Sequence, residues 1–180
     1  MASARPFALW LVPEAGAAAR LSALIEALGR RWSGPLFAPH MTLFGGHGDD
    51  DATAAAAVTR LAERGAPLTL PVRGTELGTA YFTTFFLKLG DDGAAADACE
   101  AARAALDPGS PYVLRPHLSL LYAQLDGAAR RTLGAERLDL PETLLFDRYA
   151  LVRPGTGARD WLDVAAWRVV HEAPLTQSAG

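Results

Sequence analysis

Two five-residue segments of this chain share one pattern and constrain its fold more than any other feature. The first is Pro39-His40-Met41-Thr42-Leu43, and the second, in the other half of the chain, is Pro116-His117-Leu118-Ser119-Leu120. In an extended strand, residues i and i+2 lie on the same face. Each segment therefore predicts a strand that presents a histidine and a hydroxyl on one face and buries two apolar side chains on the other.

Apolar periodicity and turn residues predict the same order of elements around each segment. The first half is expected to contain a strand at 7–12, a helix at 17–32, the motif strand at 37–44, a helix at 52–64 and a strand at 68–76. The second is expected to contain a strand at 79–89, a helix at 94–106, the motif strand at 114–122, a helix at 126–136 capped by Asp126, and closing strands at 144–152 and 161–170.

This repeated order indicates an internal duplication. The spacing between the two histidines, applied to Ala8-Leu9, leads to Phe85-Phe86, inside the strand that opens the second half. We therefore predict an α+β fold with two lobes related by a pseudo-twofold axis. Each lobe is an antiparallel sheet with helices packed outside, and the motif strands meet in the cleft between the lobes. The halves are expected at about 5–78 and 79–172 of one domain, with a disordered tail at 173–180.

Composition narrows the classes of function. The chain has 180 residues, of which 50% are hydrophobic, enough for one domain with a sizeable core. A formal net charge of −3 argues against binding of long nucleic acid, which needs a basic face. Cys99 is the only cysteine, so no intramolecular disulfide and no cysteine-based zinc site are expected. With no signal peptide and no membrane span in the sequence, we expect a soluble, cytoplasmic monomer.

Two histidine and hydroxyl pairs that face each other suit displacement at phosphorus. The imidazole pKa of about 6.5 allows one histidine to act as base and the other as acid near neutral pH. The hydroxyls of Thr42 and Ser119 would donate hydrogen bonds to the phosphate oxygens, on which charge grows in the transition state. This scheme needs neither a metal nor a cofactor.

The paired motifs resemble those of the two-histidine (2H) phosphoesterase superfamily, and of its plant-type cyclic phosphodiesterases in particular. Trp10-Leu11-Val12-Pro13 and the segment from Phe37 to Leu43 contribute to the likeness, as does the run from Pro116 to Tyr122. The resemblance implies metal-independent hydrolysis of nucleoside 2′,3′-cyclic phosphates or of ADP-ribose 1″,2″-cyclic phosphate, with a small anionic cyclic nucleotide as substrate. It also implies that His117 is the base and His40 the acid.

Tyr122 matches a family position that contacts phosphate, but strand alternation places it on the face opposite His117 and Ser119. It reaches the site only if the strand bulges near its end. The aromatic side chains of the chain, including the four tryptophans, are expected to pack in the core rather than to bind substrate.

Two alternatives remain open at this point. One is an RNA 2′,3′-cyclic phosphodiesterase or a 2′-5′ RNA ligase-like enzyme acting on RNA ends, which would need a basic path beside the cleft. The other is a nucleotide-binding module without catalysis. His47, in an acidic segment, is expected in a solvated loop, and His171 is expected at the surface.

Overall fold

A computed structural model describes residues 4–155 and 161–176 of the chain, and in these residues it contains four α-helices and seven strands. The strands are β1 (Arg5–Pro13), β2 (Met41–Gly48), β3 (Leu68–Glu76), β4 (Phe85–Leu89), β5 (His117–Leu121), β6 (Thr143–Arg153) and β7 (Arg168–Pro174). The helices are α1 (Ala15–Trp32), α2 (Asp51–Arg64), α3 (Ala94–Leu106) and α4 (Gly127–Gly134), and short 3-10 turns occupy Tyr81–Thr83 and Val164–Ala166. All strand pairs are antiparallel, so the predicted α+β class with antiparallel pairing is confirmed.

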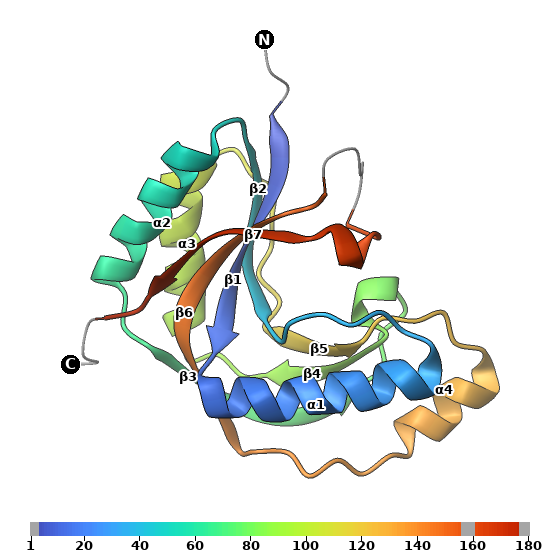
Figure 1. The fold of residues 1–180 in the computed structure, drawn as a ribbon. Coiled ribbons are helices and arrows are strands. Elements are labelled where there is room, and N and C mark those ends of the chain that lie inside the picture. The colour runs from blue at the N-terminus through green and yellow to red at the C-terminus, as the bar shows by residue number, and fades with distance from the viewer. Residues whose placement is uncertain (1–3, 156–160, 177–180) are drawn as a thin grey trace.

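The strand order reflects the duplication. The strands lie in the order β2-β1-β6-β3-β4-β5, with β7 added on β6. This order is symmetric about its centre. If β1 is exchanged with β4, β2 with β5 and β3 with β6, the same order results, read from the other end. A pseudo-twofold axis therefore passes between β3 and β6, and their pairing joins the two expected sheets into one strongly bent sheet (Figure 1).

The helices also follow the pseudo-twofold relation. Helix α1 comes from the first half but packs against β5, whereas α3 comes from the second half and packs against β2. Helices α2 and α3 lie side by side over one end of the sheet, and α1 lies across the other (Figure 1). Each half thus covers the motif strand of the other half. No helix among the described residues is long and apolar enough to cross a bilayer.

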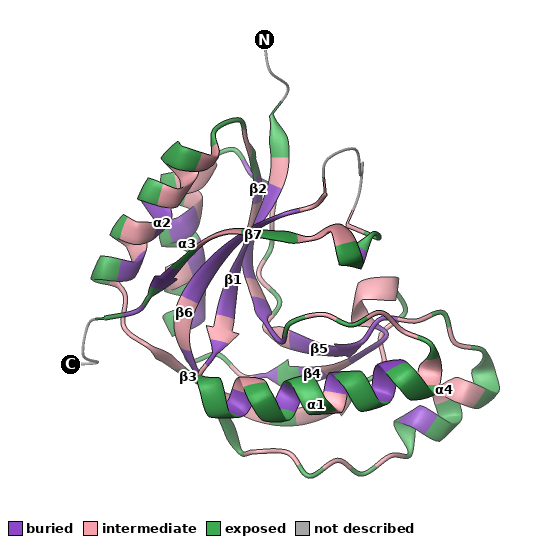
Figure 2. Ribbon diagram, viewed as in Figure 1, coloured by how far each residue is buried: buried purple, intermediate pink, exposed green. Residues whose placement is uncertain are grey.

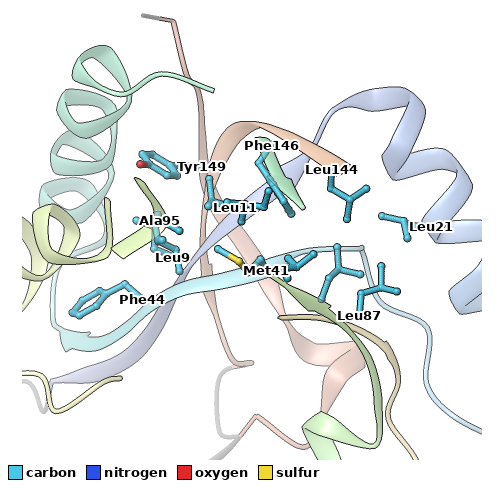
Figure 3. Close-up of a cluster of buried hydrophobic side chains, with 14 of the residues drawn as sticks. Leu9, Leu11, Leu21, Met41, Phe44, Leu87, Ala95, Leu144, Phe146 and Tyr149 are labelled. Atoms are coloured by element: carbon cyan, nitrogen blue, oxygen red, sulfur yellow. The ribbon is translucent and has the colours of Figure 1, made fainter. Parts of the chain in front are cut away.

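One apolar core lies between the sheet and the helices. The buried stripes of the helices face the sheet (Figure 2), and the core draws side chains from both halves, including Leu9 of β1, Met41 of β2, Leu87 of β4 and Phe146 of β6 (Figure 3). In the motif strands, the apolar side chains predicted to face this core do so: Met41, Leu43, Leu118 and Leu120 are all fully buried. Cys99 of α3 is buried as well.

The first motif strand differs from its prediction at both ends. Residues 37–40 lie outside the strand, and β2 continues through Gly45 and Gly46 to Gly48, where it pairs with the start of β1. These glycines serve close packing rather than a turn. A Cβ atom at Gly46 would lie 2.9 Å from Cζ of Phe7 and 3.0 Å from Cβ of Asp107. His47 is therefore a strand residue, and its backbone N–H donates to a carboxylate oxygen of Asp107.

Four further boundaries are corrected by the structure. The strand expected at 79–89 begins only at Phe85, after a 3-10 turn, and the motif strand expected at 114–122 is confined to His117–Leu121. The strand expected at 161–170 is instead a 3-10 turn followed by β7. The tail expected to start at 173 begins later, because Ala173 pairs with Tyr149 and Leu175 is buried against α2. Residues 156–160, between the two expected closing strands, and 177–180 of the expected tail lie outside the described residues.

The helix starts are fixed by acidic caps. Asp126 accepts a hydrogen bond from the backbone N–H of Ala129, which confirms it as the N-cap of α4. The carboxylate of Glu14 caps α1 in the same way, and that of Asp50 caps α2. Each carboxylate satisfies N–H groups that the helix leaves without a partner.

A buried ion pair ties the start of α2 to the sheet. The side chain of Arg153 in β6 is only 2% exposed and donates from Nε to Asp51 at 2.7 Å. Its Nη1 donates to the carbonyl of Arg5 in β1 at 2.7 Å. Burial disfavours ionisation of Asp51, but Arg153, with Arg5 and Arg168 nearby, outweighs this effect and lowers the pKa of the carboxyl. The acidic segment before α2 is therefore structural at Asp51 and not only a solvated loop.

We expect Asp51→Ala to lower the free energy of unfolding by about 3 kcal/mol, because it leaves the buried Arg153 guanidinium without a counter-charge. Urea denaturation at neutral pH measures the change. Glu26→Ala is the matched control: it removes the carboxylate of the exposed Arg30 pair on α1 and should change stability little. Equal effects of the two substitutions would contradict the structural role of Asp51.

Candidate functional site

The five residues predicted for the site lie together. A cavity of about 340 Å³ is lined by His40, Thr42, His117, Ser119 and Tyr122. It opens on the face of the sheet opposite the helices, where even-numbered residues of β1 lie, while Leu9 and Leu11 face the core. The motif segments of the two halves therefore meet in one cavity.

The two histidines are held by the same local hydrogen bond. Nδ1 of His40 lies 2.7 Å from the carbonyl oxygen of Ala38, and Nδ1 of His117 lies 2.7 Å from that of Arg115. A carbonyl can only accept, so each Nδ1 carries the proton and donates it. In the neutral ring, Nε2 then has a free lone pair. Each imidazole is thus fixed in the tautomer that leaves Nε2 available to take up or release a proton.

The surroundings of the two rings differ. His40 is 6% exposed, and burial lowers its pKa to about 4, with the positive potential of His117 acting in the same direction and the Ala38 hydrogen bond opposing it. His117 is partly exposed at the start of β5. His40 is therefore neutral in the free protein at neutral pH, whereas the ring of His117 keeps contact with water.

Matched bulges shape the two motif strands. In the β1–β2 pair, Trp10 lies opposite Thr42 and Leu9 opposite Phe44, so Leu43 is the extra residue. In the β4–β5 pair, Phe86 lies opposite Ser119 and Phe85 opposite Leu121, so Leu120 is the extra residue. Trp10 is thus equivalent to Phe86. The spacing of the two histidines would instead make Trp10 equivalent to the residue that follows Phe86.

The bulge in β5 brings Tyr122 to the cavity. An extra residue in one strand shifts the alternation of side chains beyond it. Tyr122 follows the bulge and lines the cavity with His117 and Ser119, so the condition set by the sequence is met. Its ring stacks on Phe37 at 4.0 Å between centroids. Burial raises the pKa of its phenol, and a hydrogen bond with Ser119 opposes this change.

Ser119 is already engaged in the free protein. Its hydroxyl donates to the carbonyl oxygen of Phe82 at 2.8 Å. A hydroxyl has one proton to donate, so Ser119 must turn away from Phe82 before it donates to a ligand. Thr42, its counterpart in the first half, lies on the cavity wall.

The other walls of the cavity are aromatic and were not predicted to belong to the site. They are formed by Phe7, Trp10, Phe82, Tyr112, Trp161 and Trp167. Among the described lining residues there is neither arginine nor lysine. Three of the four tryptophans therefore line the cavity. The same three also pack in a small apolar cluster with Ala8, Ala150 and Val152, so the expected packing is confirmed and the cavity wall adds to it.

The sequence contained a signal for Trp10 but not for Tyr112. Trp10 alternates with Leu9 and Leu11 along β1, so a core at those two residues puts the indole on the other face. Tyr112 lies in an irregular segment before β5, where strand alternation gives no orientation. Its hydroxyl donates to the carbonyl of Thr42 at 3.0 Å, and its ring packs on Gly45, which links this segment to β2.

The other histidines lie outside the cavity. His47 is in β2, and Nε2 of His171 in β7 lies 2.8 Å from Oγ1 of Thr59 in α2, so His171 has a specific partner rather than a free surface position. Within residues 4–155 and 161–176, no cluster of three or more histidine, cysteine or acidic side chains is arranged to hold a metal ion.

Burial of neutral His40 predicts a pH-dependent stability. Between about pH 6.5 and pH 4 the unfolded chain binds a proton at His40 that the folded protein does not. The free energy of unfolding therefore falls as the pH is lowered through this range, by about 3 kcal/mol for this group. Urea denaturation of wild type and His40→Gln at pH 7 and pH 4.5 tests this, since the variant lacks the contribution. The same pH dependence in both proteins would contradict it.

Comparison with known proteins identifies solved structures that share this fold. The chain matches no protein-family model and no curated protein sequence. Its structure is similar to TT0787 of Thermus thermophilus, with 21% identity and a TM-score of 0.63 over 97% of this chain and 100% of that one. It is also similar to E. coli LigT complexed with 3′-AMP, with 15% identity and a TM-score of 0.54 over 97% and 96% of the two chains.

A third solved structure, of a phosphoesterase, has 18% identity and a TM-score of 0.56 over 97% of this chain and 100% of that one. At these identities the likeness establishes the fold and not the activity. The plant-type subgroup stays a prediction from the motifs. The chain therefore has the α+β fold of TT0787 and of E. coli LigT.

Proposed function

We propose that this chain is a phosphodiesterase that opens small cyclic phosphodiesters, using His40 and His117 as an acid and base pair. The observation that carries the proposal is the matched placement of the two histidines. Each has Nδ1 tied to a backbone carbonyl and lines one shared cavity, next to a hydroxyl two residues further along the chain. The fold shared with LigT and with a phosphoesterase supports it.

The proposed reaction uses one proton transfer at each histidine. One neutral imidazole takes a proton from water at Nε2 as the water oxygen attacks phosphorus. The bond from phosphorus to one ribose oxygen breaks, and the imidazolium of the other histidine gives its proton to that oxygen. Thr42 donates to a non-bridging oxygen, and Ser119 does so after turning from Phe82. Protons exchanged with solvent restore the starting state.

The cavity favours a mononucleotide over a dinucleotide-like substrate. Its volume of about 340 Å³ lies near the lower end for small-molecule sites. The described walls carry no arginine or lysine to balance charge beyond one phosphate, and six aromatic rings offer apolar surface to a base. A nucleoside 2′,3′-cyclic phosphate has one negative charge, whereas ADP-ribose 1″,2″-cyclic phosphate carries a pyrophosphate in addition. We therefore place the nucleoside 2′,3′-cyclic phosphates first.

The first test is phosphorus NMR of 2′,3′-cyclic AMP with the purified protein in EDTA. Wild type should open the ring, and His40→Ala and His117→Ala should each lower kcat by about 10²–10⁴-fold, since each removes one proton-transfer group. His171→Ala is the matched control, because His171 contacts α2 outside the cavity, and it should keep wild-type activity.

Other outcomes separate the alternatives. Opening of a cyclic-phosphate-ended RNA but not of 2′,3′-cyclic AMP would favour the enzyme acting on RNA ends. A ring that stays closed on every substrate while AMP still binds would favour the binding module. Activity that EDTA abolishes would contradict a metal-independent reaction.

The second test compares substrates. We expect kcat/KM for 2′,3′-cyclic AMP to exceed that for ADP-ribose 1″,2″-cyclic phosphate by about tenfold or more, because the pyrophosphate would lose water without gaining a counter-charge from the described lining residues. Competition between the two substrates in one reaction measures the ratio directly. Equal values, or a preference for the ADP-ribose derivative, would contradict the argument that the lining of the cavity disfavours substrates with more than one phosphate charge.

A further inference from the structure

The two histidines are equivalent in sequence but not in their aromatic contacts. The imidazole of His40 stacks face to face on Trp10, with 3.6 Å between centroids and 11° between planes. The edges of Phe37 and Trp167 enclose the same ring at 6.2 Å and 6.0 Å. Among the described residues, His117 has one aromatic contact, with Phe86 at 5.3 Å between centroids and 72° between planes.

These contacts come from equivalent positions. Trp10 lies across the strand pair from Thr42, and Phe86 lies across from Ser119. Each aromatic residue therefore stands beside the histidine of its own half. The indole lies nearly parallel to the His40 ring and covers one face of it, whereas the rings of Phe86 and His117 are close to perpendicular.

We infer that Trp10 is a positioning residue that sets the plane of the His40 ring and keeps water from one face of it. Two restraints then act on one imidazole. The hydrogen bond to Ala38 fixes rotation about the side chain and the tautomer, and the indole fixes the ring plane. Nε2 is the ring nitrogen left for the cavity.

The inference has a consequence for the roles of the two histidines, and this part rests on the proposed function. A ring enclosed by aromatic side chains disfavours its charged form. His40 is then the neutral member that accepts the proton of water, and the partly hydrated His117 is the member that carries a proton to the leaving oxygen. This order is the reverse of the one that the family resemblance implies.

Among the described residues that line the cavity, few other titratable groups face His40. His117 of β5 acts on it through its charge across the cavity. The phenols of Tyr112, before β5, and of Tyr122, after it, line the same cavity, and burial raises the pKa of both, so both are neutral at the pH of interest. A change at Trp10 therefore acts on His40 through hydration and ring orientation.

The experiment is long-range ¹H–¹⁵N NMR of the histidine rings in the free protein, titrated from about pH 8 to pH 3.5. In wild type, His40 should be the Nδ1–H tautomer and titrate near pH 4. In Trp10→Leu the midpoint should rise by about one pH unit or more, because water reaches the ring, and the tautomers should become mixed. Trp10→Phe keeps an aromatic face and should restore most of the wild-type behaviour.

Phe86→Leu is the matched control, since it makes the same kind of change at the equivalent position. It should leave the His40 midpoint and tautomer as in wild type. The pH dependence of kcat/KM should follow the same pattern, with the acidic limb moving upward in Trp10→Leu along with the His40 midpoint.

Three results would overturn the inference: a wild-type His40 that titrates near pH 6.5 or carries its proton on Nε2, a midpoint that Trp10→Leu leaves unchanged or lowers, and an equal shift in Phe86→Leu. If Trp10→Leu does not fold, Trp10→Met replaces it, and the wild-type titration still decides. No substrate is present in the titrations, so their failure is distinct from a failure of the proposed phosphodiesterase activity.

Discussion

The antiparallel pairing of β3 with β6 is the interaction on which the rest of the structure depends. It runs from Leu68 opposite Phe146 to Pro71 opposite Thr143, at the centre of the strand order. The flanking strands β1 and β4 lie on either side and carry β2 and β5 outward. Because α1 crosses to β5 and α3 to β2, the apolar faces of the motif strands are covered only when the two halves are joined. The cavity is therefore a property of the whole chain.

Period-two alternation allowed much of this to be predicted from the sequence. Met41 and Leu43 of β2 face the core and Thr42 faces the cavity, as the pleat of a strand requires, and His40 continues this alternation just before β2. The same alternation holds at the start of β5. Which strands become neighbours is not encoded in that local pattern. The sequence therefore indicated two sheets, whereas hydrogen bonds between β3 and β6 join them into one.

The residues that escaped prediction did so for identifiable reasons. A pair of glycines is typical of a turn, but Gly45 and Gly46 lie in a strand. A larger residue at these positions would clash with Tyr112 or Phe7. Tyr122 did not escape, but it was predicted for the site only on the condition of a bulge, and a bulge is visible only in the pairing of two strands. The tryptophans are apolar enough to pack in a core, and apolarity alone does not tell a core residue from one that lines a cavity. Trp10, Trp161 and Trp167 line the cavity wall.

The matched bulges and matched histidine hydrogen bonds show how closely the motif segments of the two halves agree, which makes the difference between Trp10 and Phe86 informative. A dimer of two identical halves would have two identical histidines, because a twofold axis gives both copies the same surroundings. In such an assembly, any residue that excluded water from one imidazole would exclude water from the other as well. Linking the halves in one polypeptide removes that restriction. An indole can then stand beside one imidazole and a phenyl ring beside the other, so a single covalent connection allows two copies of one motif to hold different numbers of protons.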